Sequence, residues 1–178
     1  MIEVEKKFDI THAEPLIQSA TFVRNVVQDD IIYDDDNFYL STHNACLRQR
    51  NGQWEIKLPK TGVISENISI HDEIVGYDEI CSALQVQDLS KFHVVWHLVT
   101  YRKKYKFLDF NLDVDHVESQ NNDFVYDLLE IELMVDDSSQ CSVATQRIEN
   151  LAKQYNLVPK NGKNLEYFKR YCATNILN

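Results

Sequence analysis

Hydrophobic and polar residues alternate along much of this chain with the two-residue period that is typical of β-strands. The first segment of this kind covers residues 2–8. Because successive side chains of a strand point to opposite faces, its apolar residues share one face, and Glu3, Glu5 and Lys7 share the other. The chain is therefore predicted to open with a strand that has one apolar and one charged face.

The same period, together with β-branched and aromatic residues, predicts further strands. They cover residues 22–33 with a bend near 28–30, 45–50, 53–58, 67–74, 92–101, 105–115 and 124–135. The sharpest local signal is Asn51-Gly52, a dipeptide that favours a two-residue hairpin turn between the third and fourth of these segments. Residues 34–37 are predicted to form a turn and residues 59–65 a loop.

Helices are predicted between and after these strands, over residues 11–20, 77–86, 139–156 and 163–174. The first begins at Thr11, which forms a capping-box pattern with Glu14. The third is the most clearly helical, and its core candidates are Val143, Ile148, Leu151 and Tyr155. Without internal repeats or low-complexity segments, the eight strands and these helices predict one α+β domain over residues 1–178, built on an antiparallel sheet.

Charged residues recur at two-residue spacing on strand after strand, with apolar residues between them. The charged faces carry Arg48 and Arg50; Glu55 and Lys57; Arg102, Lys104 and Lys106; Asp113 and Asp115; and Glu130 and Glu132. An antiparallel sheet with one solvated face explains such a pattern on a single strand. Here, however, acidic and basic pairs are segregated, and the strongly apolar faces need helices to cover them. Eight strands are enough to close a barrel, which would place the charged faces in its lumen.

A charged lumen is costly unless its charges are paired or are neutralised by a ligand. Paired carboxylates form a site of hard oxygen ligands, which suits Mg²⁺ and also Mn²⁺. Clustered Arg and Lys suit phosphate oxygens, and Arg can bind them through two parallel hydrogen bonds. The combination predicts a receptor for a metal-chelated polyphosphate. The sequence contains no P-loop, glycine-rich turn or recognisable nucleophile motif that competes with this interpretation.

The composition is that of an ordinary globular protein, with 44% hydrophobic and 26% charged residues in a chain of 178. A net charge of −10 argues against nucleic acid or an anionic membrane as a partner. No apolar run approaches the roughly 20 residues of a membrane span, and we expect no signal peptide ahead of the first strand. The cysteines match no zinc or disulfide spacing and are expected to be free thiols: Cys46, Cys81, Cys141 and Cys172. We therefore expect a cytoplasmic protein, and a monomer.

The residues also resemble a known family. Residues 3–7, Glu-Val-Glu-Lys-Lys, fit the ExExK signature of the CYTH superfamily, the triphosphate tunnel metalloenzymes. Segments that match in the family's order follow at 30–34, 46–50, 54–59, 112–115, 129–132 and 162–165. The segments 30–34, 46–50 and 54–59 look like the animal thiamine triphosphatase branch. The resemblance runs from Ile2 to Tyr171.

The resemblance implies an eight-stranded antiparallel tunnel that binds a triphosphate in its lumen. It places these acids on the metal side: Glu3, Glu5, Asp113, Asp115, Glu130 and Glu132. It places these residues at the triphosphate: Lys7, Arg48, Arg50, Lys57, Arg102 and Lys163, with Glu73 as a further lumen acid. Of the bases, Lys57 and Arg102 are the candidates for stabilising charge at the transferred phosphoryl group. Lys104 is a candidate from the strand pattern alone.

One residue departs from the thiamine triphosphatase pattern. Vertebrate members carry Trp just before the Leu-Arg-x-Arg stretch, where it can stack on the thiamine moiety, and this chain has Cys46 there. By analogy with nucleobases, the loss of a stacking surface removes roughly 1–3 kcal/mol of binding. Tyr33, Phe38 and Tyr39 are the aromatic residues that could replace it.

The sequence is therefore interpreted as that of a Mg²⁺-dependent hydrolase that converts thiamine triphosphate to thiamine diphosphate and phosphate. Inorganic tripolyphosphate or a nucleoside triphosphate is the nearest alternative substrate. Adenylate cyclisation is a second reaction class that the resemblance allows, and a non-catalytic polyphosphate-binding module is a third possibility. The acid pairs argue against the last, because binding an anion needs bases but no acids.

Overall fold

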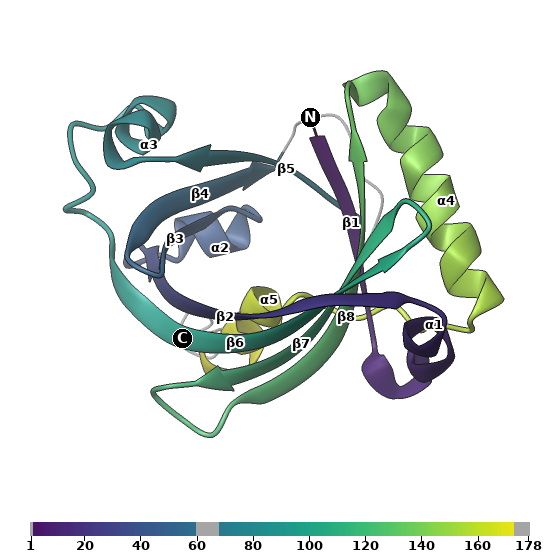
Figure 1. Cartoon of the computed structure of the whole chain (residues 1–178). Coiled ribbons are helices and arrows are strands. Elements are labelled where there is room, and N and C mark those ends of the chain that lie inside the picture. The colour runs from purple at the N-terminus through teal and green to yellow at the C-terminus, as the bar shows by residue number, and fades with distance from the viewer. Residues whose placement is uncertain (1, 60–67, 173–178) are drawn as a thin grey trace.

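The computed structural model describes residues 2–59 and 68–172. Eight antiparallel strands close into a barrel in the order β1-β5-β4-β3-β2-β6-β7-β8, which confirms the predicted fold class (Figure 1). The strands are β1 (Ile2–Phe8), β2 (Thr21–Asp34), β3 (Cys46–Arg50), β4 (Gln53–Pro59), β5 (Ile68–Val75), β6 (His93–Phe107), β7 (Phe110–Ser119) and β8 (Val125–Val135). The helices are α1 (Glu14–Gln18), α2 (Tyr39–Thr42), α3 (Tyr77–Leu84), α4 (Cys141–Gln154) and α5 (Lys163–Tyr167). Short turns complete the chain: the 3₁₀ turns η1 (Ile10–His12) and η2 (Ser138–Gln140), and the π-helical turn η3 (Phe168–Cys172).

The strand register places charges inside the barrel and apolar side chains outside it. Strand β1 lies between β5 and β8, with Glu5 opposite Glu132 and Val4 opposite Leu133. Residues that are directly opposite in an antiparallel pair share a face. The register therefore gathers acids on the lumen face of these two strands and apolar residues on the outer face.

Helix α4 covers the outer face of β1 and β8 (Figure 1). Its Ile148 and Leu151 pack with Val4 of β1 in one buried apolar cluster, as the sequence pattern predicted for the two helical residues. The predicted core residue Val143 is instead 64% exposed. The buried stripe of the helix runs through Ala144 and Ile148, and the 3.6-residue period turns Val143 away from it.

One end of the barrel is closed by apolar side chains. Trp96 and Leu98 of β6 pack with Leu128 of β8 in a buried cluster that also contains Tyr167 of α5. By the alternation along β6, Trp96 and Leu98 lie on the same face as Arg102. The lumen therefore has a closed, apolar end under α5 and an open, charged end.

The first predicted helix is interrupted in the structure. Turn η1 is capped by Asp9, not by Thr11; the Asp9 carboxylate accepts a hydrogen bond from the Thr11 backbone N–H (2.8 Å). Helix α1 then begins at Glu14. Pro15 explains the interruption, because Pro fits the first turn of a helix and breaks its interior. Helix α2 was not predicted, since four residues are too few to show a helical period.

Strand β6 is longer than predicted. The sequence pattern ended one strand at Tyr101 and began another at Tyr105, but residues 102–104 continue β6 and the turn falls at Leu108 and Asp109. Strands β2 and β7 pair with both edges of this segment, so its charged residues have a regular place in the sheet. Leu108 takes a positive φ of 55°. A bulky residue rarely adopts that conformation, so the turn carries no sequence signal.

Strand β2 is regular where a bend was predicted, near residues 28–30. Its irregularities lie between Phe22 and Arg24 and between Ile32 and Tyr33. Most of the predicted loop at 59–65, the predicted strand start at 67 and the predicted helix end at 173–174 lie outside the described residues.

Within the described residues, no helix has both the length and the apolar character that crossing a membrane requires. The described cysteine side chains, Cys46, Cys81 and Cys141, are free thiols, as predicted. The side chain of Cys172 lies outside the described part of the chain.

Replacing Asp34 with Ala is expected to destabilise the protein by roughly 3 kcal/mol, because its fully buried carboxylate caps helix α2. The carboxylate accepts hydrogen bonds from the backbone N–H groups of Leu40 (2.9 Å) and Ser41 (2.8 Å), which the variant would leave unpaired. Urea unfolding measures the change. Asp36→Ala removes a nearly fully exposed carboxylate and should leave the midpoint unchanged. Equal losses in the two variants would contradict the capping role.

Candidate functional site

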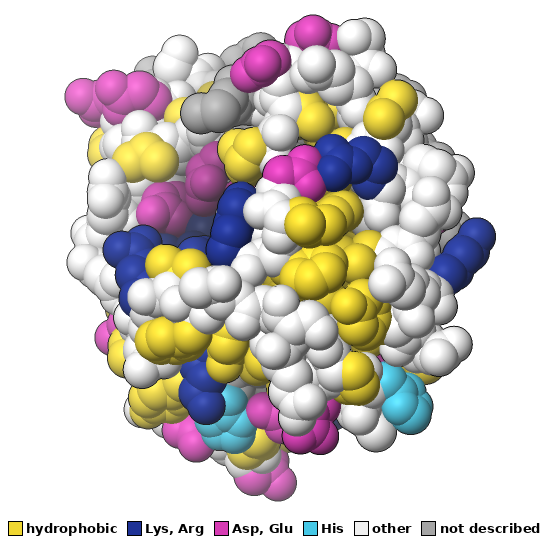
Figure 2. All heavy atoms as spheres, turned by 45° about the vertical axis from the view of Figure 1, so that its right-hand side comes forward, with side chains coloured by type: hydrophobic (Ala, Val, Ile, Leu, Met, Phe, Trp, Pro, Cys, Tyr) yellow, Lys and Arg dark blue, Asp and Glu magenta, His cyan; other side chains and the backbone are white. Residues whose placement is uncertain are grey.

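The charged faces of the strands meet in the lumen, at the end of the barrel that α5 leaves open. The exposure of their side chains rises from 0% at Asp30 and 1% at Asp115 to 29% at Lys104 and 30% at Glu3. Figure 2 shows the opening as a hollow with acidic side chains inside it and basic side chains at its edge. The alternating charges of the sequence are thus a lumen lining and not the wet face of an open sheet.

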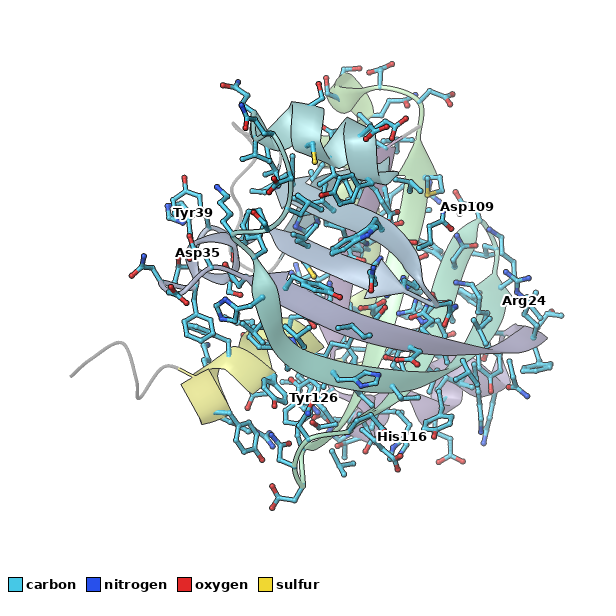
Figure 3. All side chains as sticks on the ribbon, turned by 90° about the vertical axis from the view of Figure 1, so that its left-hand side faces the viewer. Arg24, Asp35, Tyr39, Asp109, His116 and Tyr126 are labelled. Carbon is cyan, nitrogen blue, oxygen red and sulfur yellow. The ribbon has the colours of Figure 1, made fainter. Side chains whose placement is uncertain are left out.

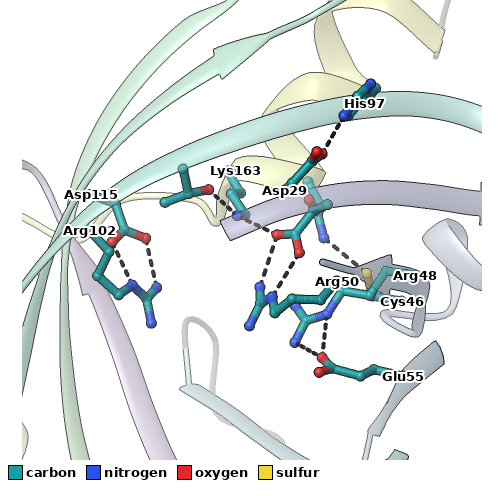
Figure 4. A network of polar contacts seen from close by, with 12 residues as sticks. Asp29, Cys46, Arg48, Arg50, Glu55, His97, Arg102, Asp115 and Lys163 are labelled. Carbon is teal, nitrogen blue, oxygen red and sulfur yellow. Dashed lines mark hydrogen bonds and ion pairs between the residues drawn. The ribbon is translucent and has the colours of Figure 1, made fainter. Parts of the chain in front are cut away.

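Asp30 holds two of the predicted phosphate-binding bases in place, Arg50 and Lys163, and Figure 4 labels these two bases. Its carboxylate accepts hydrogen bonds from Arg50 Nε (2.7 Å) and Nη2 (2.9 Å), and from Lys163 Nζ (2.9 Å). Lys163 also donates to Thr100 Oγ1 (2.5 Å). Burial works to raise the pKa of Asp30, but Lys163 and Arg50 outweigh it and hold that pKa far below its usual range. The sequence pattern did not single out Asp30; it lies directly opposite Arg50, and only the strand register shows this.

Arg48 is held by two acids, Glu55 of the neighbouring strand β4 and Glu73 of β5. Its Nε and Nη2 atoms donate to Glu55 Oε2 (2.9 and 2.7 Å), and Nη2 also donates to Glu73 Oε1 (3.0 Å). Glu73, predicted for the substrate site, therefore lies beside a predicted substrate base, with 42% of its side chain exposed. Glu55 had no predicted role. These contacts fix the Arg48 guanidinium in the lumen.

Arg102 contacts three carboxylates. It donates to Asp115 through Nε and Nη2 (2.7 Å each), to Asp113 through Nη1 (2.5 Å) and to Glu130 through Nη2 (2.5 Å). Burial would lower the pKa of Arg102, but Glu130 and the two aspartates raise it above its usual range. One permanent cation is thus the shared partner of three buried carboxylates.

Two lysines complete the set of bases. Lys7 donates through Nζ to Glu5, and Lys57 Nζ lies 3.6 Å from Glu3 Oε1. Gly162 allows the Lys7 side chain to take this path, because a Cβ at Gly162 would lie only 3.1 Å from the Cδ and Cε atoms of Lys7. The segment that leads into α5 is therefore packed directly against a lumen base.

Five of the six predicted metal-binding acids form two groups that share Glu132. The groups are Glu3, Glu5 and Glu132, and Asp113, Glu130 and Glu132; in each, one oxygen per residue lies within 4.8 Å of the others. The Oδ1 atom of Asp113 is buried and has no hydrogen-bond partner among the described residues. Such carboxylate oxygens, one of them orphaned, fit a hard divalent cation such as Mg²⁺. The sixth acid, Asp115, belongs to neither group and instead binds Arg102.

The acid groups retain protons near neutral pH. Glu132 has no cationic partner within the described ranges, and burial, with help from Asp113 and Glu3, raises its pKa to about 9. Burial also raises the pKa of Glu3 to about 7. Burial also works to raise the pKa of Glu5, but the positive charge of Lys7 outweighs it and holds this pKa well below its usual range. A metal ion that binds these groups must displace protons, so its affinity should rise with pH.

Two further residues line the same region. Lys104, predicted from the strand pattern, donates through Nζ to Asp113 Oδ2 (2.6 Å), directly across from it in the β6–β7 register. His71 of β5 lies opposite Glu3 and is half-buried, and burial lowers its pKa. The sequence pattern did not indicate His71, because its strand lacks a run of charges at two-residue spacing.

Cys46 lies at the closed end of the lumen. Asn164 of α5 donates a hydrogen bond through Nδ2 to the Sγ atom of Cys46 (3.1 Å). The Cys46 side chain also packs against the apolar cluster around Trp96. Burial raises the pKa of the thiol, which is therefore neutral at physiological pH. The space beside the arginines is thus filled by a small neutral side chain.

The aromatic residues considered as replacements for a stacking surface have other contacts. Tyr33 packs on Trp54 with 4.6 Å between ring centroids, and Tyr39 stacks on His43 at 4.1 Å. Phe38 packs against the same cluster as Cys46. Of the three, Phe38 is therefore the aromatic side chain that shares the surroundings of Cys46.

The sequence model of the CYTH domain matches residues 1–163 of this chain. The match includes every predicted site residue, from Glu3 to Lys163. No curated protein matches the sequence.

Solved structures share the fold at low sequence identity. The PH1819 protein of Pyrococcus horikoshii OT3 is 19% identical, with 95% of this chain and 99% of that chain covered and a TM-score of 0.64. A Vibrio parahaemolyticus protein provisionally called an adenylate cyclase is 18% identical, with 95% and 98% covered and a TM-score of 0.59. A Bacillus halodurans protein with the same provisional name is 16% identical, with 97% and 98% covered and a TM-score of 0.60. At these identities the likeness shows the barrel fold alone.

Proposed function

This chain belongs to the CYTH domain family, and we propose that it is a Mg²⁺-dependent hydrolase of a triphosphate compound. One observation carries the proposal: a closed barrel presents basic side chains and two groups of acids to the same lumen. Bases alone would suffice to bind an anion, whereas buried acid groups need a cation to neutralise them. A triphosphate with its chelated metal supplies both kinds of charge.

Hydrolysis joins a water oxygen to the terminal phosphorus and breaks the bond from that phosphorus to the bridging oxygen. The products are the diphosphate compound and inorganic phosphate, and the protons of the water pass to the phosphate and to solvent. Negative charge is spread over the terminal and bridging oxygens in the transition state. Lys57 and Arg102 would stabilise this charge. The other bases would hold the triphosphate along the lumen: Lys7, Arg48, Arg50 and Lys163.

The two acid groups that share Glu132 are the residues that would hold Mg²⁺. The bound ion would neutralise phosphate charge and lower the pKa of a coordinated water. Arg102 would exchange part of its carboxylate contacts for phosphate oxygens. Because Asp115 lies outside both acid groups, its role in this proposal is to orient Arg102.

The substrate we propose first is thiamine triphosphate, because the segments 30–34, 46–50 and 54–59 resemble the thiamine triphosphatase branch. Inorganic tripolyphosphate is the second candidate, and Cys46 favours it because a thiol offers no stacking surface. Phosphate release from both compounds and from ATP, compared as kcat/KM with Mg²⁺, decides between them. Cyclic AMP formed from ATP would instead identify an adenylate cyclase, and tight binding without turnover a polyphosphate-binding module.

Replacing Arg50 with Ala should weaken triphosphate binding by roughly 10- to 100-fold, because a guanidinium donates charge-assisted hydrogen bonds to phosphate. The carboxylate of Asp30 keeps Lys163 as a partner, so the barrel should remain folded. Steady-state kinetics should show the loss mainly in KM. Arg147→Ala removes an exposed arginine on the outside and should change neither constant. Unchanged kinetics in Arg50→Ala would place Arg50 outside the substrate site.

A further inference from the structure

Two of the lumen bases meet on a single carboxylate oxygen. Asp30 Oδ2 accepts hydrogen bonds from Arg50 Nη2 and from Lys163 Nζ, each 2.9 Å away. The other oxygen, Oδ1, accepts a hydrogen bond from Arg50 Nε (2.7 Å). Because both cations contact the same atom, their nitrogen atoms lie within about 6 Å of each other, and one phosphate group can reach both.

Two cations this close repel each other unless an anion lies between them. The carboxylate of Asp30 is fully buried, and only 19% of the Arg50 side chain and 11% of the Lys163 side chain are exposed. Water therefore screens the repulsion poorly. The charge of Asp30 is what allows the two bases to lie together.

Lys163 is the member of the pair whose charge depends on Asp30. Burial lowers the pKa of Lys163, Asp30 raises it, Arg50 lowers it, and Asp115 of β7 raises it. A guanidinium keeps its proton in proteins, whereas the pKa of a buried lysine shifts readily. If Asp30 carried no charge, Lys163 would therefore lose its proton at a lower pH, and Arg50 would stay charged.

Both bases keep hydrogen-bond donors for a ligand. An ammonium group has three N–H bonds, and Lys163 uses two of them, for Asp30 and for Thr100 Oγ1. Arg50 uses Nε and Nη2 for Asp30, and its Nη1 atom has no hydrogen-bond partner within residues 2–59 and 68–172. Asp30, in contrast, has both oxygens bonded to the bases, and its negative charge would repel a phosphate.

The segment that carries Lys163 is anchored by contacts other than Asp30. The hydroxyl group of Tyr126 donates a hydrogen bond to the carbonyl oxygen of Asn161 (2.9 Å), and Figure 3 shows Tyr126 beside α5. Tyr167 of α5 packs in the same apolar cluster as Tyr126. The loss of the Asp30 charge should therefore leave α5 in place.

We propose that Asp30 is a positioning residue for the triphosphate: it holds Arg50 and Lys163 side by side, so that their free donors bind the same phosphate group. The inference rests on the proposed function, because it takes the lumen as the triphosphate site. Asp30 itself does not touch the phosphate. It acts through Lys163, which it keeps charged and in place.

Asp30→Asn tests this role, because it removes the charge and keeps the shape of the side chain. Calorimetric titration with tripolyphosphate, in the presence of a chelator, measures binding without turnover at pH 6 and at pH 9. Relative to the wild type at the same pH, the variant should bind about tenfold more weakly at pH 9 than at pH 6, because Lys163 is then uncharged. Lys163→Arg in the Asp30→Asn background should remove this pH dependence, since a guanidinium stays charged.

A second measurement needs no ligand. The nitrogen NMR signal of the Lys163 ammonium group, identified by its absence in Lys163→Arg, reports the pKa of this lysine directly in a pH titration. Asp30→Asn should lower that pKa, because the neighbouring negative charge is gone. Arg50→Ala should raise it, because a neighbouring positive charge is gone, and this variant keeps the test decisive if Asp30→Asn does not fold.

Two other aspartates of β2 are the matched controls. Asp34 is equally buried, but its carboxylate accepts hydrogen bonds from the backbone of Leu40 and Ser41 and not from a base. Asp34→Asn should therefore lower stability without changing the pH dependence of binding. Asp29 lies on the opposite face of the strand from Asp30 and pairs with His97, so Asp29→Asn should change neither property.

Three results would overturn the proposal. They are a loss of affinity in Asp30→Asn that is equal at both pH values, the same pH dependence in Asp34→Asn, and a pKa of Lys163 that neither Asp30→Asn nor Arg50→Ala shifts. A wild-type protein that does not bind tripolyphosphate would refute the proposed function and, with it, this role of Asp30. Tight binding of tripolyphosphate with an unshifted Lys163 titration would refute the role of Asp30 alone.

Discussion

Glu132→Gln is expected to abolish Mg²⁺-dependent phosphate release and, at the same time, to stabilise the metal-free protein at pH 8. Glu132 belongs to both acid groups, so an uncharged side chain of the same size removes a carboxylate from each. The loss of this charge at a metal-dependent step should lower kcat on the order of 10³-fold. The protein should remain folded, because the substitution changes the shape of the side chain very little.

The stability of the metal-free variant changes in the favourable direction because the lumen disfavours the charged form of Glu132. Burial and the neighbouring acids raise its pKa from 4.5 to about 9 in the folded protein. Between pH 4.5 and about pH 9, Glu132 has released its proton in the unfolded chain but retains it in the folded protein. The folded protein therefore becomes less stable as pH rises through this range. Gln cannot ionise and escapes this loss, which at pH 8 amounts to something on the order of 5 kcal/mol.

Urea unfolding in the presence of a chelator, at pH 5 and at pH 8, measures the effect. The wild-type protein should lose stability between the two conditions, and Glu132→Gln should lose less. Glu118→Gln, on the outer face of β7 with 43% of its side chain exposed, is the control and should follow the wild type. A folded Glu132→Gln variant with full turnover would disprove the assignment of the acid groups, and a variant less stable than the wild type at pH 8 would disprove the linkage argument.

Arg102→Gln should be strongly destabilising, by roughly 3–5 kcal/mol at pH 8, because it removes the common partner of three buried carboxylates. Asp113 keeps a contact with Lys104, and Glu130 keeps its proximity to Lys7 (3.7 Å), but Asp115 loses both of its hydrogen bonds to Arg102. The loss of stability in Arg102→Gln should far exceed the loss caused by removing a surface arginine.

The defect of Arg102→Gln should shrink as pH falls. Without the guanidinium, the pKa of Asp115, which burial already raises, should rise further, and its folded form should then bind a proton that the unfolded form does not. Stability of the variant relative to the wild type therefore recovers below that raised pKa. Unfolding midpoints at pH 8 and pH 5 measure the recovery.

Two further variants make this result interpretable if Arg102→Gln fails to fold at pH 8. Arg102→Lys retains one positive charge and should fold with an intermediate loss of stability. Arg147→Gln removes an exposed arginine, paired with Asp109 outside the barrel, and should be nearly neutral. If Arg102→Gln is no less stable than Arg147→Gln, the buried acids do not depend on Arg102.

The charged faces of the strands could be predicted because side-chain direction is a local property of a strand. Glu3, Glu5 and Lys7 share a face whichever strands lie beside β1, since the period of two is built into the extended backbone. The hairpin at Asn51-Gly52 is equally local, and it was predicted correctly. The prediction failed where local signals were absent, as at the turn after Phe107, or misleading, as in the charged segment 102–104 that continues β6.

The partners of the predicted residues could not be read from the sequence. Asp30 meets Lys163 across 133 positions of the chain, and Asp30 lies opposite Arg50 only in the β2–β3 register found in the structure. Register depends on contacts between whole strands, and a shift by one residue would send every side chain of a strand to the other face.

By itself the sequence determined which residues share a face, and from these faces it predicted hard oxygen ligands for a cation and bases for phosphate. Only the tertiary structure decided that these faces point into one lumen, that this lumen is closed at the Cys46 end, and that Asp115 accepts hydrogen bonds from Arg102 and lies outside both acid groups. The physical reason is that one strand's own backbone sets the direction of its side chains. The closure of the barrel, in contrast, depends on the packing and pairing of segments that are distant in the chain.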